Sequence, residues 1–358
     1  MDAKRVVVKI GTGVLTKGVG QLDTKKMSAI CRQVAALRAR GCQVALVSSG
    51  AVGLGMGRLA LKERPKRISA VQKCAAVGQG ILIDTWSRLF VRHGFVIAQL
   101  LLTKDDVDVQ RRHRAMGELF NELLGENIVP VINENDSVSA SELNIKFGDN
   151  DVLSALVASL VKADDLVILS TASGLLDLGG SGEMVKRVEK IDAGIRSMAG
   201  GTTSATAVGG MITKIRAAEI ATKSGCGTYI ANGSEPRVLE KIFDGKNPGT
   251  YFVPSKKSVS SKKRWLAYFG HTCGKISVDE GAVDALRGHG SSLLLAGVKS
   301  VEGNFAEGDL IEVFSADTRE IVARGLAYMP SSEMSRLAGS KTGGKKLLAI
   351  HRDSLAIR

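Results

Sequence analysis

Two clusters of carboxylate and carboxamide side chains are the strongest chemical signal in this sequence. Residues 133–136 (Asn-Glu-Asn-Asp) follow the apolar run 127–132, and residues 148–151 (Gly-Asp-Asn-Asp) stand where a helical pattern begins. The apolar run is typical of a buried strand in a parallel sheet, and open parallel sheets bind ligands beyond the carboxyl ends of their strands. Acceptor and amide groups at that edge suit a small ligand with an ammonium group. One cluster alone would more often be a polar loop with helix caps, but two clusters accompanied by lysines and glycine turns favour a binding site.

Two turns in the first fifty residues could hold phosphate. Lys9 ends an apolar run and precedes Gly11 and Gly13, which would let backbone N–H groups approach an anion closely. Ser49 and Gly50 follow a second apolar run, where amide groups at a helix start could form an anion pocket. Taken alone, each segment could equally be an ordinary turn of an α/β fold.

A third turn carries a stronger phosphate signal. Residues 208–214 (Val-Gly-Gly-Met-Ile-Thr-Lys) open a helical pattern with two glycines and place Lys214 in its second turn. A lysine near a helix N-terminus opposes the helix dipole, and a bound anion would offset that cost. Lys9 and Lys214 would then clamp a transferring phosphoryl group, a reaction that rests on positioning and charge neutralisation. The sequence has no Walker loop, and its glycine run at 53–57 is not a dinucleotide motif.

Alternating strand-like and helix-like runs fill the first 250 residues and would position these groups. They predict an α/β fold with a mainly parallel sheet that is covered on both faces. The predicted strands are residues 5–10, 43–47, 95–102, 128–132, 166–170 and 228–231. The predicted helices are residues 24–40, 68–91, 150–162 and 209–223. Asp149 or Asn150 would cap the helix at 150–162, so the second polar cluster lies at a helix start.

The pattern changes at residues 254–264, a polar and basic segment that is typical of a linker. Beyond it the signal is one of short strands with a single helix. The strands are predicted at 275–278, 292–298, 310–314 and 321–329, and the helix at 280–288. The sequence therefore predicts a domain at 1–253, a linker at 254–264 and a small β-rich, barrel-like domain at 265–358.

Bulk composition narrows the class of protein. A length of 358 residues with 44% hydrophobic residues is expected to form two domains with sizeable cores. The net charge of +13 suits either nucleic acid or an anionic substrate, and charge alone does not choose between them. Five scattered cysteines without a C-x-x-C pair indicate a reducing compartment rather than a disulfide or zinc framework. With no signal-peptide pattern and no apolar run near the roughly 18 residues of a membrane span, a cytoplasmic protein is expected.

Five motifs, taken in their order along the chain, resemble the glutamate 5-kinase family of the amino acid kinase superfamily. They are Lys9, Ser49–Gly50, Asn-Glu-Asn-Asp, Gly-Asp-Asn-Asp and Gly-Gly-Met-x-Thr-Lys. This resemblance runs from Arg5 to about residue 253. The remainder is similar to the PUA domain that follows the kinase domain in many members of that family, notably at residues 275–282, 290–294 and 297–305. The fold implied is a three-layer αβα sandwich followed by a small PUA barrel.

The resemblance also implies an activity and its partners. The substrates would be ATP, with Mg²⁺, and L-glutamate, and the product would be γ-glutamyl phosphate at the first step of proline synthesis. A carboxylate acceptor has an ordinary pKa of about 4.3, so it is ionised at pH 7 and needs no catalytic histidine as a base. Proline as feedback inhibitor, contact with glutamate-5-semialdehyde dehydrogenase and a homo-oligomeric state are implied too, whereas RNA and membranes are not implied as partners.

Site residues carry over where the motifs match. The catalytic residues implied are Lys9, Lys214 and Asp151, with Asp151 holding the two lysines in register. The substrate-binding residues implied are Ser49, Gly50, Asp136 and Asn150. The ATP-binding residues implied are Lys9, Gly11, Ser170, Thr171, Val208, Gly209, Gly210, Met211, Ile212, Thr213 and Lys214. No protein metal site is implied, because Mg²⁺ would be carried by ATP.

Three positions depart from the family pattern. The family usually has serine where Gly13 stands, aspartate where Thr171 stands, and often threonine where Val208 stands. The missing carboxylate leaves the preference for the nucleotide donor open. After Gly339 the chain also looks short for the last strands of a PUA domain.

Two other functions stay open at this point. One is a related kinase with another acceptor, such as acetylglutamate, aspartate, carbamate or a nucleoside monophosphate. The Asn-Glu-Asn-Asp run and the appended β-rich domain argue against it. The other is an RNA-binding protein that acts through the PUA domain. The kinase motifs, and the lack of an aromatic and basic stacking surface, argue against that function.

Overall fold

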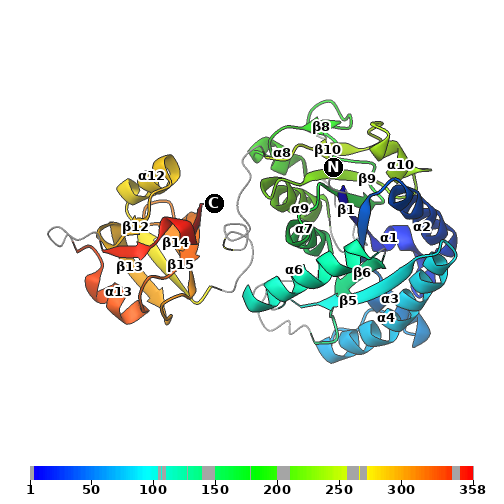
Figure 1. Cartoon of the computed structure of the whole chain (residues 1–358), viewed down its shortest axis with the longest axis horizontal. Helices are drawn as coiled ribbons and strands as arrows, with labels where there is room; N and C mark the ends of the chain where they lie inside the picture. The colour runs from blue at the N-terminus through cyan, green and yellow to red at the C-terminus, as the bar shows by residue number, and fades with distance from the viewer. Residues whose placement is uncertain are drawn as a thin grey trace. The chain divides into compact units, whose positions relative to one another are not determined.

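We describe the fold from a computed structural model of the chain. The described residues are 4–103, 106, 110–126, 128–138, 150–177, 179–199, 210–255, 266, 272–340 and 347–357. They form two compact units, whose main parts are residues up to 258 and residues 259–358 (Figure 1).

The large unit is built on an eight-stranded sheet. In spatial order its strands are β5 (Val96–Leu102), β6 (Ile128–Glu134), β4 (Gln43–Ser48), β1 (Arg5–Ile10), β7 (Asp165–Ser170), β9 (Gly227–Asn232), β10 (Thr250–Phe252) and β8 (Arg187–Val188). The first six strands pair in parallel, whereas β10 pairs antiparallel with β9 and parallel with β8. Valine, isoleucine and leucine fill the central strands because parallel strands are buried on both faces.

Helices cover both faces of this sheet. The longer helices are α2 (Thr24–Ala39), α3 (Ala51–Arg58), α4 (Ile68–Val91), α6 (Gln110–Gly125), α7 (Asn150–Leu160) and α9 (Met211–Lys223). The shorter elements are α1 (Thr12–Leu15), β2 (Thr16–Gly18), β3 (Gln21–Leu22), α8 (Ala193–Met198) and α10 (Val238–Phe243).

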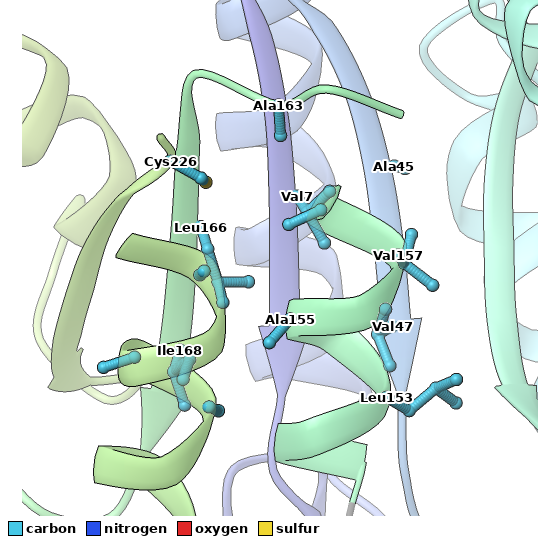
Figure 2. Close-up of a cluster of buried hydrophobic side chains, with 14 of the residues drawn as sticks. Val7, Ala45, Val47, Leu153, Ala155, Val157, Ala163, Leu166, Ile168 and Cys226 are labelled. Carbon is cyan, nitrogen blue, oxygen red and sulfur yellow. The ribbon is translucent and has the colours of Figure 1, made fainter. Parts of the chain in front are cut away.

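Alternate residues of each central strand face opposite helical layers. Val6 and Val8 of β1 join a buried cluster with residues of α2 and α4, while Val7 joins a second cluster with α7 and α9. Figure 2 shows this second cluster, in which α7 lies over β1 and β4 and brings Ala155 and Val157 close to the sheet. This alternation is the two-residue period of a strand. The structure therefore confirms the predicted three-layer αβα sandwich.

The small unit has a core of its own and is rich in strands. Its five-stranded sheet has the order β13 (Val298–Gly303), β11 (Gly274–Val278), β14 (Leu310–Ser315), β15 (Ile321–Leu326) and β17 (Leu355–Ile357). A two-stranded sheet joins β12 (Leu293–Leu294) to β16 (Leu348–Ile350), and the helices are α12 (Glu280–His289) and α13 (Ser331–Leu337). Buried aliphatic side chains from both sheets and both helices fill the core.

Several predicted boundaries differ from the structure. Strand β6 continues two residues beyond the predicted end and includes Asn133 and Glu134. The single strand predicted at 292–298 is wrong, because the 3-10 turn Leu295–Gly297 separates β12 from β13. The strand predicted at 321–329 ends at Leu326.

The region beyond residue 339 is more complete than the sequence suggested. It contributes β16 and β17, which pair with β12 and β15 respectively. Most of the predicted linker at 254–264 lies outside the described residues. Among the helices that the structure describes, none has the length and apolar character needed to cross a membrane.

Candidate active site

Four parallel strands bring the predicted site residues to one edge of the sheet. The carboxyl ends of β1, β4, β6 and β7 lie at this edge, because all four strands run in the same direction. Lys9 stands one residue before the end of β1, Ser49 follows β4, Asn133 lies near the end of β6, and Ser170 ends β7. The starts of α7 and α9 bring Asp151 and Lys214 to the same edge. Ligands of open α/β sheets bind at this edge.

Lys9, Asp151 and Lys214 form a buried charged triad. The two carboxylate oxygens of Asp151 serve different lysines. Oδ1 pairs with Lys9 Nζ, and Oδ2 lies 3.0 Å from Lys214 Nζ. The Asp151 side chain is fully buried, and the lysine side chains are only 7% and 8% exposed. Thr213 Oγ1 also donates to Asp151 Oδ2, at 3.0 Å.

The electrostatics of the triad keep Asp151 ionised. Burial alone would raise the pKa of Asp151, but the charges and hydrogen bonds of Lys9 and Lys214 outweigh burial and lower that pKa below its usual value. Two buried cations around one carboxylate leave an excess of positive charge. Such an arrangement is suited to binding an anion such as a phosphoryl group.

Helix starts explain the placement of the triad. Asp151 lies in the first turn of α7, where a negative charge interacts favourably with the helix dipole. Lys214 lies near the start of α9, where its charge opposes the dipole, and Asp151 offsets part of that cost. The three residues come from β1, α7 and α9, so only the fold brings them together.

The turn after β1 differs from the sequence expectation in one respect. The backbone N–H of Gly11 donates to the Leu169 carbonyl oxygen at 2.9 Å, so it is not available to hold a phosphate. A Cβ built on Gly11 would lie 3.2 Å from that oxygen and 3.7 Å from Lys9 Nζ. The glycine therefore keeps space open beside the lysine ammonium group.

Gly50 shapes the turn between β4 and α3. It is the N-cap of α3 with φ 107°, a backbone conformation that glycine adopts far more readily than other residues. No side chain caps this helix start. Ser49, immediately before it, accepts a hydrogen bond from Asn150 Nδ2 at 2.9 Å.

Hydrogen bonds link three side-chain amides at this edge of the sheet. Asn150 Nδ2 donates to Asn133 Oδ1 at 3.0 Å, and Asn133 Nδ2 donates to Gln79 Oε1 at 2.9 Å. Asn150 Oδ1 is buried and has no hydrogen-bond partner among the residues that the structure describes. The substrate-binding candidates Ser49 and Asn150 are thus brought together beside the charged triad.

Some of the remaining candidate residues lie near this edge of the sheet, and others fall outside the described residues. Asp136 lies in the turn that follows β6, where burial raises its pKa and the charge of Arg64 opposes that shift. Thr171 is exposed just beyond β7, and Gly210 caps the start of α9. Gly148, Asp149, Val208 and Gly209 lie outside the described residues.

Gln79 was not among the predicted site residues, and Asn133 was predicted only as part of a polar run. Gln79 stands between Gly78 and Gly80 in a long helical pattern, and nothing in that pattern predicts a partner on β6. A polar residue flanked by glycines in an otherwise apolar segment is the one signal that could have drawn attention to it.

Comparison with known proteins shows the family to which this chain belongs. Residues 4–232 match the amino acid kinase family, and residues 274–343 match the PUA domain. A glutamate 5-kinase from Thermoanaerobacter sp. (strain X514) is 43% identical over 99% of this chain and 97% of its own length. The chain belongs to the glutamate 5-kinase family.

More distant relatives agree with this assignment. Glutamate 5-kinases from Neisseria meningitidis serogroup A and Streptococcus suis are 41% and 38% identical, each over 99% of this chain, and the match covers 96% and 99% of their own lengths. A carbamate kinase from Giardia lamblia bound to AMP-PNP has a TM-score of 0.52 and 18% identity, covering 71% of this chain and 99% of its own. That likeness concerns the fold alone.

Two departures from the glutamate 5-kinase pattern lie against each other in the structure. A Cβ built on Gly13 would lie 2.8 Å from Thr171 Cγ2. A serine at residue 13 would therefore force Thr171 to move. The glycine and the threonine fit together as a pair across the turns that follow β1 and β7.

We expect Asp136→Asn to raise KM for glutamate about 10- to 100-fold, the loss expected for a hydrogen bond to a charged group, with little change in KM for ATP. Initial rates with each substrate varied in turn would test this expectation. A changed KM for ATP with an unchanged KM for glutamate would mean that Asp136 belongs to the nucleotide site and that the assignments of the two binding sites must be exchanged.

The same variant should be slightly more stable than the wild type at pH 7. The raised pKa of Asp136 means that the folded state disfavours its ionised form, so stability is lost as pH rises through the folded pKa. Asparagine does not ionise and avoids that loss. Melting temperatures at pH 7 and near pH 4 should therefore show an advantage for the variant that shrinks at the lower pH.

Proposed function

We propose that this chain transfers the γ-phosphoryl group of ATP to the side-chain carboxylate of L-glutamate, forming γ-glutamyl phosphate for proline synthesis. The observation that carries the proposal is the buried Lys9–Asp151–Lys214 triad beside the Ser49–Asn150 pair at the carboxyl edge of the sheet. Membership of the glutamate 5-kinase family supports the choice of acceptor.

The proposed reaction needs charge neutralisation more than proton transfer. A carboxylate oxygen of glutamate attacks the γ-phosphorus of ATP while the bond between that phosphorus and ADP breaks. Both reactants are anions, and Lys9 and Lys214 reduce their repulsion and stabilise charge on the transferring group. Asp151 acts by holding the two ammonium groups in place.

The proposed nucleotide site lies along the ends of β1 and β7 and the start of α9. The described residues that we assign to it are Lys9, Gly11, Ser170, Thr171, Gly210, Met211, Ile212, Thr213 and Lys214. Ile212 is 61% exposed, which leaves an apolar side chain available to pack against part of the nucleotide. Val208 and Gly209 belong to the same assignment through the sequence motif.

Magnesium would enter with ATP. Mg²⁺ is usually held by phosphate oxygens, waters and one or two carboxylates rather than by a full protein cage. Within the described residues, no group of three or more histidine, cysteine or acidic side chains could hold a metal ion alone. When bound, Mg²⁺ would neutralise part of the charge that develops on the transferring phosphoryl group.

An acceptor panel tests the proposal. ADP formation should be measured with L-glutamate, N-acetylglutamate, aspartate, carbamate and a nucleoside monophosphate. We expect L-glutamate to have the highest kcat/KM by at least about 100-fold, because a site that pairs with an α-ammonium group leaves buried polar atoms unpaired with other acceptors. Equal or faster turnover with another acceptor would assign the chain a different substrate.

We also propose regulatory and cellular properties that the family suggests. Proline would inhibit the enzyme, since it shares an α-carboxylate and an α-nitrogen with glutamate. The active form would be a homo-oligomer that contacts glutamate-5-semialdehyde dehydrogenase. A cytoplasmic location is supported by the five cysteines, all of which have free thiols.

We assign residues 1–253 to the kinase domain, 254–264 to a linker and 265–358 to the PUA domain. A chain truncated after Ser258 should keep kinase activity within about one order of magnitude, because each unit has its own core and should fold alone. Regulation could change without affecting the chemistry. A soluble, folded truncated chain without activity would show that the PUA domain is required.

The same pair of proteins tests the RNA-binding alternative. We expect weak RNA binding by both, because the positive charge is spread along the chain rather than concentrated in one domain. Titration at several salt concentrations would measure it. Strong, steeply salt-dependent binding by the full chain alone would favour a nucleic-acid role for the PUA domain.

A further inference from the structure

We propose that Gln79 is a positioning residue for the acceptor. Through Asn133 it sets the orientation of the Asn150 side-chain amide, so that Asn150 Oδ1 faces the α-ammonium group of glutamate. The proposal rests on the proposed function in one respect, since it takes Asn150 as a contact of the acceptor. Gln79 itself need not touch the substrate.

A backbone group fixes the direction of the hydrogen-bond chain. The backbone N–H of Glu134 donates to Asn133 Oδ1 at 2.9 Å. A backbone N–H can only donate, so this atom of Asn133 must be the oxygen, and its Nδ2 must point toward Gln79. Gln79 Oε1 accepts from that Nδ2 at 2.9 Å. Gln79 and the Glu134 backbone therefore hold Asn133 from both sides.

The orientation of Asn133 determines that of Asn150. Because Asn133 Oδ1 is an acceptor, the atom of Asn150 that lies 3.0 Å from it must be the donor Nδ2. This Nδ2 also donates to Ser49 Oγ at 2.9 Å. Both amide hydrogens of Asn150 are thus used within the protein, and its oxygen is directed elsewhere.

The unpartnered oxygen suits an ammonium group. Asn150 Oδ1 is buried and has no hydrogen-bond partner among the described residues, a state that is costly unless a ligand supplies a donor. The Ser49 hydroxyl accepts from Asn150, so its own hydrogen remains available to donate to a carboxylate. An acceptor and a donor side by side match the α-ammonium and α-carboxylate groups of an amino acid.

Glycine packing explains how α4 brings Gln79 close enough. A Cβ on Gly78 would lie 1.8 Å from the Ala51 carbonyl oxygen and 2.5 Å from the Gly55 nitrogen. A Cβ on Gly55 would lie 1.8 Å from the Cys74 carbonyl oxygen. The backbones of α3 and α4 therefore touch directly at these glycines, which only glycine permits. The residue after Gly78 is Gln79, so this contact holds the amide against β6.

A second hydrogen bond anchors the same helix beside the site. Trp86 on α4 is fully buried, and its Nε1 donates to Ser48 Oγ at 3.0 Å. Ser48 ends β4, directly before Ser49. Gln79 thus projects from a helix that is held against α3 by the glycines and against β4 by Trp86, as a residue that orients another side chain should be.

Kinetics of Gln79→Met test the proposal. Methionine keeps the length and helix propensity of glutamine but replaces the amide oxygen that accepts from Asn133 with a thioether sulfur, which is only a weak acceptor. We expect KM for glutamate to rise about tenfold, the effect of one lost hydrogen bond, while kcat and KM for ATP change less than about twofold. The matched control is Thr85→Val on the same helix, whose hydroxyl bonds only to the Ile81 carbonyl among described groups. It should leave all three constants unchanged.

A double-mutant cycle separates positioning from a structural role. If Gln79 acts through Asn150, Gln79→Met should have almost no further effect on KM for glutamate in an Asn150→Ala background. Gln79→Ala serves as a second variant, and each protein is assayed below its own melting temperature.

Three results would overturn the positioning role. They are an unchanged KM for glutamate in both Gln79 variants, an equal rise in KM for ATP, and a tenfold effect that persists without the Asn150 amide. A wild-type enzyme that does not phosphorylate glutamate would instead refute the proposed function. The two failures are therefore distinguishable.

Discussion

Replacement of Lys214 by alanine is expected to lower kcat about 100- to 1,000-fold, the loss seen when a preorganised group that stabilises transition-state charge is removed. KM for glutamate should change much less, because we propose that Lys214 contacts the transferring phosphoryl group rather than the α-groups of the acceptor. Asp151 is expected to keep its position in this variant, because Lys9 still pairs with its other carboxylate oxygen. Steady-state rates with both substrates varied would separate the two constants.

The control for this experiment is Lys223→Ala. Lys223 lies on the same helix, α9, and its half-exposed ammonium group pairs with Glu219 at the surface. Both variants remove one lysine from one helix, yet only Lys214 is part of the buried triad. Near-normal turnover by Lys214→Ala would remove Lys214 from the catalytic assignment, and an equal loss in Lys223→Ala would point to a general effect on the helix.

Asp151→Asn is expected to damage both stability and turnover. The change leaves two buried lysines without their counter-ion, which should cost about 3 kcal/mol of the free energy of unfolding and lower the melting temperature by roughly 10 °C. The kcat should fall as well, because the two ammonium groups lose the carboxylate that positions them. Urea unfolding and steady-state kinetics would measure the two effects.

The stability effect of Asp151→Asn should depend on pH. The folded-state pKa of Asp151 is lowered, so its contribution is fully present above the unfolded pKa of about 3.9 and is lost as pH falls through the lower folded value. The difference between wild type and variant should therefore narrow only in strong acid. Asp244→Asn, which breaks a surface ion pair with Arg40, is the control and should leave the melting temperature nearly unchanged. A pH-independent difference, or one as small as the control, would contradict the account of the triad.

Six of the eight strands of the large sheet and four of its six longer helices were predicted from hydrophobic pattern, whereas α3, α6, β8 and β10 were not. The central strands are continuous apolar runs, and the helix at Ile68–Val91 has the predicted bounds. The small unit was harder, since three residues of 3-10 helix divide one apparent strand into β12 and β13. Short apolar runs do not reveal such a break, because either conformation can bury them.

Most of the residues that meet at the sheet edge were named from the sequence, but their contacts were not. Local pattern predicted that Lys9 and Lys214 clamp one phosphoryl group, and only the resemblance linked them to Asp151. Their pairing depends on three elements that meet at the sheet edge, which no local pattern encodes. Gly11 shows the converse, because its N–H was expected to face a phosphate but is bound to the Leu169 carbonyl oxygen.

The contact between Gln79 and Asn133 could not be predicted from the sequence, for a physical reason. This contact depends on the direct backbone approach of α3 and α4 at Gly55 and Gly78. Glycines within a helical pattern signal close packing, but not the element against which they pack.

Isotope transfer tests the central claim most directly. L-Glutamate labelled with ¹⁸O in its side-chain carboxylate is incubated with ATP and the enzyme, and hydroxylamine then cleaves the acyl phosphate at carbon. If a glutamate oxygen attacks the γ-phosphorus, the phosphate released should carry one ¹⁸O atom, and the glutamate should be recovered as its γ-hydroxamate. Phosphate without ¹⁸O would mean that water, not glutamate, accepts the phosphoryl group, and would contradict the proposed function.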